Sequence, residues 1–173
     1  MNLSYYDVTV PVFKKNLLIV QTLVKKGFEH ALSKGMTEAD FLNQRLAPDM
    51  FPLLNQIRIV TDNAKGAVAR FTAAEPLSIE DKETTVAELM ARIDKVIAFV
   101  ESFTPDKFEQ ASEQKIIISY IPGKYQKASD YLVDFALPNF FFHMSMIYAI
   151  LRAQGVEIGK MDFLGGLKLH PVE

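Results

Sequence analysis

The chain has no cysteine among its 173 residues. Disulfide bonds, thiolate metal sites and a cysteine nucleophile are therefore excluded, and the absence suits a reducing compartment such as the cytoplasm. The chain also has no basic block, because its 19 lysines and arginines are scattered among 21 acids. A net charge of -2 gives no electrostatic reason to expect nucleic acid as a partner.

Long apolar runs are missing as well. The start of the chain lacks the basic region and apolar stretch of a secretory leader. The most hydrophobic segment, Phe135–Leu151, is interrupted by Pro138, Asn139 and His143. It is shorter than the ~20 apolar residues that span a bilayer. We interpret it as a buried helix of a cytoplasmic protein and expect no membrane association.

What is present is ordinary globular composition. Hydrophobic residues make up 49% of the chain and charged residues 23%. The length fits one domain, and we expect residues 1–173 to fold as a single unit with its own core.

Four segments carry apolar residues at three- and four-residue steps, which is the period of an amphipathic helix. They are predicted to cover residues 4–34, 50–71, 85–103 and 129–154. Pro11 either lies in the first turn of the first helix or kinks it, and Pro52 fits the first turn of the second. Thr85 and Glu88 form a capping-box pattern, and Gly35 and Gly155 suit helix ends.

The connections between the four predicted helices differ in length and in structure. Residues 36–50 form a long link with a helical turn near 37–42, and residues 75–81 form a loop. The β-branched run 116–121, followed by Pro122 and Gly123, predicts a short strand or hairpin. We therefore expect a mainly α fold: a four-helix bundle with a long crossover connection and a short β or irregular segment between the third and fourth helices.

The fourth helix is apolar almost all round over residues 140–151. Such a helix needs partners on more than one side. Either it is central and covered by the loops and tail, or one flank packs against a second subunit.

His143 is the most informative single residue. It lies on the inward stripe of the fourth helix, with Asn139 one turn earlier, and Pro138 should kink or restart the helix there. One interpretation is a polar pocket that binds a metal or a small ligand. The other, which we favour, is a core histidine with both ring nitrogens hydrogen-bonded.

Other polar residues carry weaker signals. His30 and His170 have no second histidine at helical spacing, so neither predicts a metal pair. Asp81 and Glu83 precede the third helix, where negative charge favours the helix dipole. Arg45, Asp49 and Arg70 could form ion pairs around the second helix, but we favour a solvated role for them.

Several strings, taken together, resemble a known family. They are Arg45–Leu53, Asp81–Thr84, Leu137–His143, Leu151-Arg152 and Gly155–Gly165. This combination resembles an uncharacterised bacterial family of the DinB/YfiT-like superfamily. The resemblance implies a four-helix bundle and often a homodimer. Many members of that superfamily hold a divalent metal on three histidines, one from the second helix and two from an H-x-x-x-H pair on the fourth, and some are thiol-dependent transferases or isomerases.

Only part of the superfamily's set of metal-binding histidines is present in this chain. By this resemblance His143 corresponds to the second histidine of the pair, Asn139 to the first, and Gln56 to the histidine of the second helix. Amide oxygens are poor ligands for zinc or nickel. We therefore expect a degenerate metal site, in which His143, Asn139 and Gln56 line a polar pocket between the second and fourth helices.

Two functions remain open. The first is a non-enzymatic or small-ligand-binding homodimer that needs no cofactor and whose ligand is small and polar. The second is a metal-dependent transferase or hydrolase that uses Zn or Ni, with His143 as the surviving ligand. Only one of the three metal-ligand positions holds a histidine, which favours the first function. No catalytic residue is identified.

Overall fold

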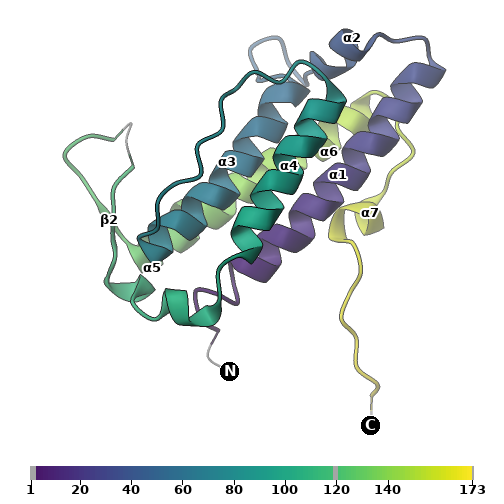
Figure 1. Cartoon of the computed structure of the whole chain (residues 1–173). Helices are drawn as coiled ribbons and strands as arrows, with labels where there is room; N and C mark the ends of the chain where they lie inside the picture. The colour runs from purple at the N-terminus through teal and green to yellow at the C-terminus, as the bar shows by residue number, and fades with distance from the viewer. Residues whose placement is uncertain (1–2, 119–120, 173) are drawn as a thin grey trace.

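Four long helices form the body of the molecule, which is a computed structural model describing residues 3–118 and 121–172. They are α1 (Val10–Ser33), α3 (Leu53–Thr72), α4 (Val86–Glu101) and α6 (Leu137–Ala153). α3 packs against α4 and α6, and α1 packs against the same two helices, so the four make a closed square (Figure 1). The prediction of a mainly α four-helix bundle is confirmed.

A long crossover joins α3 to α4. Residues 73–85 run back along the outside of the bundle, so α3 and α4 point the same way (Figure 1). The short helix α2 (Glu38–Leu42) covers the end where α4 begins, and its Glu38 Oε1 accepts a hydrogen bond of 2.7 Å from the backbone N–H of Val86. The crossover is therefore attached to the bundle at its far end.

Local signals explain most helix boundaries. The capping box at Thr85 and Glu88 is present, and Gly35 and Gly155 both have positive φ just after a helix, as predicted. The first helix begins at Val10 rather than near residue 4, with Pro11 in its first turn. The second begins at Leu53 rather than near residue 50, because Pro52 occupies the N-cap position with extended backbone.

The link between α4 and the last helix is irregular. It contains the 3-10 turns η1 (Pro105–Phe108) and η2 (Ala111–Glu113), and the strands β1 (Lys115–Ile116) and β2 (Gln126–Lys127), which pair antiparallel. A small hairpin was predicted here, but the strands are shorter and lie at its two ends. Of the predicted strand 116–121, Ile116 alone is in β1, and residues 119–120 lie outside the described part of the chain.

The last long helix contains a wide turn. α5 (Ala128–Tyr131) leads into the π-helical segment η3 (Leu132–Ala136) and then into α6. The backbone N–H of Leu137 bonds to the carbonyl of Leu132, five residues back. In a regular α-helix, the ring of Pro138 would clash with the carbonyl of Asp134, and the wide turn relieves that conflict. The predicted irregularity at Pro138 thus takes the form of a π-bulge.

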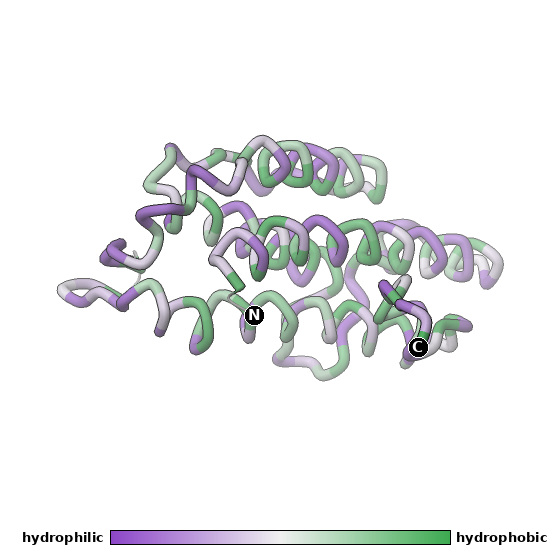
Figure 2. Tube along the Cα trace, turned by 90° about the horizontal axis from the view of Figure 1, so that it is seen from below, coloured by the Kyte–Doolittle hydropathy of each residue, from purple (hydrophilic) through white to green (hydrophobic). Residues whose placement is uncertain are grey.

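The core lies between the four helices, where their apolar faces meet. Hydrophobic and hydrophilic stretches alternate along the helical turns (Figure 2). Phe13 of α1 and Phe140 of α6 are fully buried, with ring centroids 4.8 Å apart. Ile93 and Ile147, central to the predicted stripes, are also fully buried.

By length and composition, Ala128–Ala153 is the one helical stretch in the described residues that could cross a membrane. Core helices of soluble proteins meet the same criteria, and one face of this helix is in the bundle core. The tail contains α7 (Lys160–Leu164), which is tied to α1 by the ion pair between Lys26 and Asp162, 2.6 Å long.

Candidate functional site

A buried hydrogen bond joins two of the three predicted site residues. His143 Nδ1 lies 2.7 Å from Gln56 Oε1, and the two side chains are 8% and 2% exposed. Their positions follow from helix packing, because α6 presents His143 on its inward face and α3 presents Gln56 on the face that packs against α6. The structure therefore brings His143 and Gln56 together between the second and fourth long helices.

The surroundings of Gln56 fix the proton on His143. Gln56 Nε2 donates to the carbonyl of Phe51 at 3.0 Å, so its amide oxygen is the atom that faces the imidazole. An oxygen acceptor requires that Nδ1 carry the hydrogen. Burial lowers the pKa of His143 below its ordinary value of 6.5. The ring is thus neutral at pH 7, with a lone pair on Nε2.

Asn139 stands apart from this pair. It lies one turn before His143 on α6 and is half-buried. Its side chain makes no hydrogen bond to any residue in the two described ranges. Asn139 therefore adds a polar group beside the histidine without completing a three-residue hydrogen-bonded set.

The donors here suit a transition metal poorly. One imidazole nitrogen and two neutral amides provide no charge to offset a divalent cation, and zinc and nickel favour imidazole and thiolate. Among the described residues, no group of three or more histidine, aspartate or glutamate side chains gathers where it could hold a metal ion. The residues at the three family ligand positions do not fit a tightly held Zn or Ni.

A further polar residue on the same helix escaped sequence analysis. Asn63 lies seven residues after Gln56 on α3, so both point to nearly the same side. It is 7% exposed, and both polar atoms of its amide are buried without a hydrogen-bond partner in the described structure. A buried amide in this state is a place for an ordered water or a polar ligand group.

A buried arginine organises the opposite side of α3. Arg92 of α4 is 2% exposed and donates to Thr61 Oγ1, Asp62 Oδ1, Asp81 Oδ1 and Glu83 Oε1 at 2.7–2.9 Å. Asp81 and Glu83 therefore serve as its partners, not simply as charges at a helix start, which corrects the sequence-based interpretation.

Glu83 is also held by Arg58, whose Nε lies 2.9 Å from Glu83 Oε2. Burial alone raises the pKa of Glu83, but the hydrogen bond and charge of Arg92, with the hydrogen bond from Arg58, bring it below its usual value. Glu83 therefore stays ionised at pH 7, and the cluster ties the crossover to α3 and α4.

The comparisons with known proteins agree with this architecture. Residues 5–164 match the family described as "Domain of unknown function (DUF1993)". The chain belongs to the DUF1993 family. No curated protein matches it.

This DUF1993 protein also resembles the crystal structure of a DinB family member protein from Shewanella denitrificans. The two are 37% identical, with a TM-score of 0.92 over 96% of this chain and 95% of the other. The resemblance to an uncharacterised DinB-like family, predicted from the sequence strings, is confirmed.

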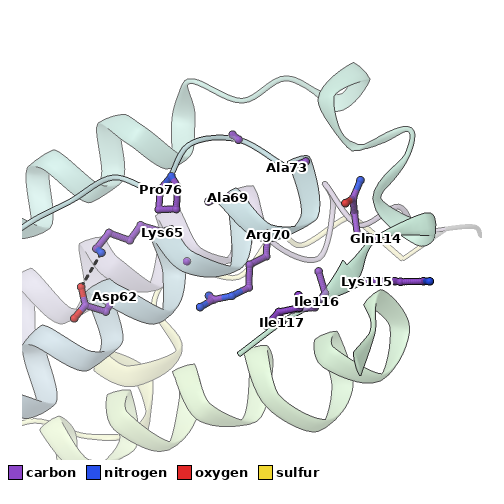
Figure 3. A pocket seen from close by; sticks show the side chains of 12 residues that line it. Asp62, Lys65, Ala69, Arg70, Ala73, Pro76, Gln114, Lys115, Ile116 and Ile117 are labelled. Atoms are coloured by element: carbon purple, nitrogen blue, oxygen red, sulfur yellow. Dashed lines mark ion pairs between the residues drawn. The ribbon is translucent and has the colours of Figure 1, made fainter. Parts of the chain in front are cut away.

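A cleft lies on the DUF1993 bundle away from His143, between the end of α3, the start of the crossover and β1 (Figure 3). Its volume is about 550 Å³. Charged side chains at the cleft are Asp62, Lys65, Arg70 and Lys115, and Ile116 and Ile117 form an apolar wall. Arg70 is half-buried here. Its side chain reaches into the cleft from α3, whereas that of Lys115 points away (Figure 3).

Proposed function

We propose that this protein is a non-enzymatic, small-ligand-binding bundle that acts as a cytoplasmic homodimer and whose family metal position has become a neutral polar site. One observation carries the proposal: the hydrogen bond from His143 to Gln56. It uses one imidazole nitrogen and the amide oxygen that would otherwise face a metal. Burial keeps that imidazole uncharged.

The chemistry of the site limits its ligand. His143 Nε2 is an acceptor, and Asn139 one turn away offers both a donor and an acceptor. Neither has a charge, so an ion would lose hydration without compensation. A small neutral molecule with an N–H or O–H group, or an ordered water, meets these groups at lower desolvation cost.

Dimerisation is supported by the outward face of α6. Between Phe135 and Leu151 no residue carries a formal charge at pH 7, because His143 is neutral. Phe142 on this face is 52% exposed. An uncharged apolar face of this kind is typical of a surface that a second subunit covers.

The alternative is a metal-dependent transferase or hydrolase. One observation favours it: His143 Nε2 keeps its lone pair and has no hydrogen-bond partner among the described residues. A metal could use that nitrogen, with water and recruited carboxylates as its other ligands.

Metal analysis of untagged protein, purified without chelator, separates the two functions. We expect far less than one zinc, nickel or iron per chain, and no change in His143→Ala. A stoichiometric metal that is lost in His143→Ala would establish the alternative. His30→Ala is the matched control, because His30 is a histidine on α1, outside the α3–α6 interface.

Ligand binding at the neutral site is tested with acetamide as the probe. In NMR titrations, acetamide should shift the His143 ring signals of the wild type. It should cause no comparable shift in the ring signals of His30. Unchanged His143 signals at high probe concentration would refute the neutral site.

A further inference from the structure

Arg70 is held in an unusual position on α3. Its guanidinium lies back over Gly66, one turn earlier, so that a Cβ added at Gly66 would come within 2.5 Å of Arg70 Nη1. Glycine is unfavourable inside a helix. Because Gly66 has no Cβ, the guanidinium of Arg70 can occupy this position at the cleft.

The described part of the protein satisfies few of the hydrogen-bond donors of the Arg70 guanidinium. Nη1 donates to the hydroxyl of Tyr131 at 3.3 Å, and Cζ lies 5.7 Å from the centre of the Tyr131 ring. Within residues 3–118 and 121–172, Arg70 forms no ion pair with a carboxylate. A guanidinium has five N–H donors, so most of its capacity is unused.

The neighbouring charges are already paired. Lys65 Nζ lies 3.1 Å from Asp62, which also accepts from Arg92 at 2.7 Å. Lys115 Nζ lies over the ring of Tyr125, 5.2 Å from its centre. Three cations and one acid line the cleft, and Arg70 is the cation whose guanidinium reaches into it with no carboxylate partner among the described residues (Figure 3).

From this geometry we propose that the cleft is a binding site for a small carboxylate with an apolar body, and that Arg70 is the residue that holds its carboxylate. A planar carboxylate matches the fork of one guanidinium, and the apolar body would lie against Ile116, Ile117 and Pro76. A phosphate would call for several cationic donors, whereas among the described residues of the cleft one guanidinium reaches inward without a carboxylate partner. This site is separate from the His143 site and does not depend on the function proposed for it.

Hexanoate is the probe, and calorimetry with the full chain is the measurement. We expect saturable binding of one hexanoate per chain. Arg70→Gln should weaken it at least tenfold, because a neutral amide provides no charge and no fork. Gly66→Ala should weaken it similarly, since the new Cβ displaces the guanidinium while every charge is retained and alanine favours the helix.

Controls separate this site from general charge effects. Lys25→Gln removes the same charge at an exposed position on α1 and should leave hexanoate affinity unchanged. His143→Ala should also leave it unchanged, which keeps this test independent of the neutral site. Hexylamine, with the opposite charge, should not bind.

Three results would overturn the proposal. One is the absence of hexanoate binding to the wild type at millimolar concentrations. Another is equal affinity in wild type, Arg70→Gln and Gly66→Ala. The third is inorganic phosphate binding as tightly as hexanoate, because the apolar wall would then contribute nothing.

Discussion

The neutral imidazole of His143 makes the free energy of unfolding depend on pH. Its pKa is lowered by burial in the folded chain, whereas in the unfolded chain it titrates near its ordinary value of 6.5. As pH falls through that value, the unfolded state takes up a proton that the folded state does not, so the free energy of unfolding falls. The maximal slope from one such group is about 1.4 kcal/mol per pH unit.

We therefore predict that urea unfolding of the wild type shows a loss of stability between pH 7 and pH 5 that is reduced in His143→Gln. The glutamine keeps a neutral hydrogen-bonding group opposite Gln56 but cannot titrate. Equal pH slopes in the two proteins would contradict the assigned protonation state. His170→Gln, an exposed substitution, is the control and should retain the wild-type slope.

Ala73 is the one non-glycine residue with positive φ in the described chain, at 52°. It ends α3 in the left-handed conformation, which is unfavourable for a residue with a Cβ. Ala73→Gly should therefore raise the free energy of unfolding by about 0.5–1 kcal/mol. Ala74→Gly, next to it without a positive φ, should not stabilise, and a gain in both variants would point to another cause.

At the level of single residues, sequence analysis predicted part of the site. The inward positions of His143 and Gln56 follow from helical period and family resemblance, and they do meet. The side chain of Asn139 is not bonded to them, because contacts across α3 and α6 depend on how far one helix is shifted along the other. Asn63 gave no signal, since an asparagine in a helix is ordinarily read as solvated.

Between elements, the Arg92 cluster is the main polar connection. The arginine joins α4 to α3 and to the crossover, and its side chain is 1% exposed. Removing one member of a buried ionic cluster leaves charges without partners. We predict that Arg92→Met lowers the free energy of unfolding by about 3–5 kcal/mol, near the lower end because Arg58 still holds Glu83.

Urea denaturation with Lys82→Met as the control checks this. Lys82 pairs with Glu80, and both side chains are at least 69% exposed. Such a surface pair contributes about 0–1 kcal/mol, so Lys82→Met should change stability little. If the two variants lose the same stability, the buried cluster is not a structural connection.

The elements themselves were largely predictable because their signals are local. The capping box at Thr85 and the glycines after α1 and α6 act within one turn of the residues that they end or begin. The Arg92 cluster was not predictable in the same way. Its acids come from two segments of the chain, α3 and the crossover, and only the path of the crossover brings Asp81 and Glu83 to α4. A charged residue on a helix has no local pattern that distinguishes burial from solvation.

For the whole molecule, the proposed dimer makes a direct prediction. If the outward face of α6 is the interface, Phe142→Glu should convert the protein to a monomer, because a buried charge without a partner opposes association. Light scattering at high micromolar concentration should give a dimer mass for the wild type and a monomer mass for the variant. Leu32→Glu, which changes a similarly exposed apolar residue on α1, should remain dimeric. A monomeric wild type would rule out the dimer.

The closed square of helices also constrains how the chain is made. Phe13 and Phe140 meet in the core although they lie near opposite ends of the chain. During synthesis, α1, α3 and α4 emerge first, and α1 and α3 leave bare the apolar faces that α6 will cover. The core can close only after α6 has left the ribosome. Nascent chains stalled before residue 137 should therefore be the aggregation-prone, chaperone-dependent form of this protein.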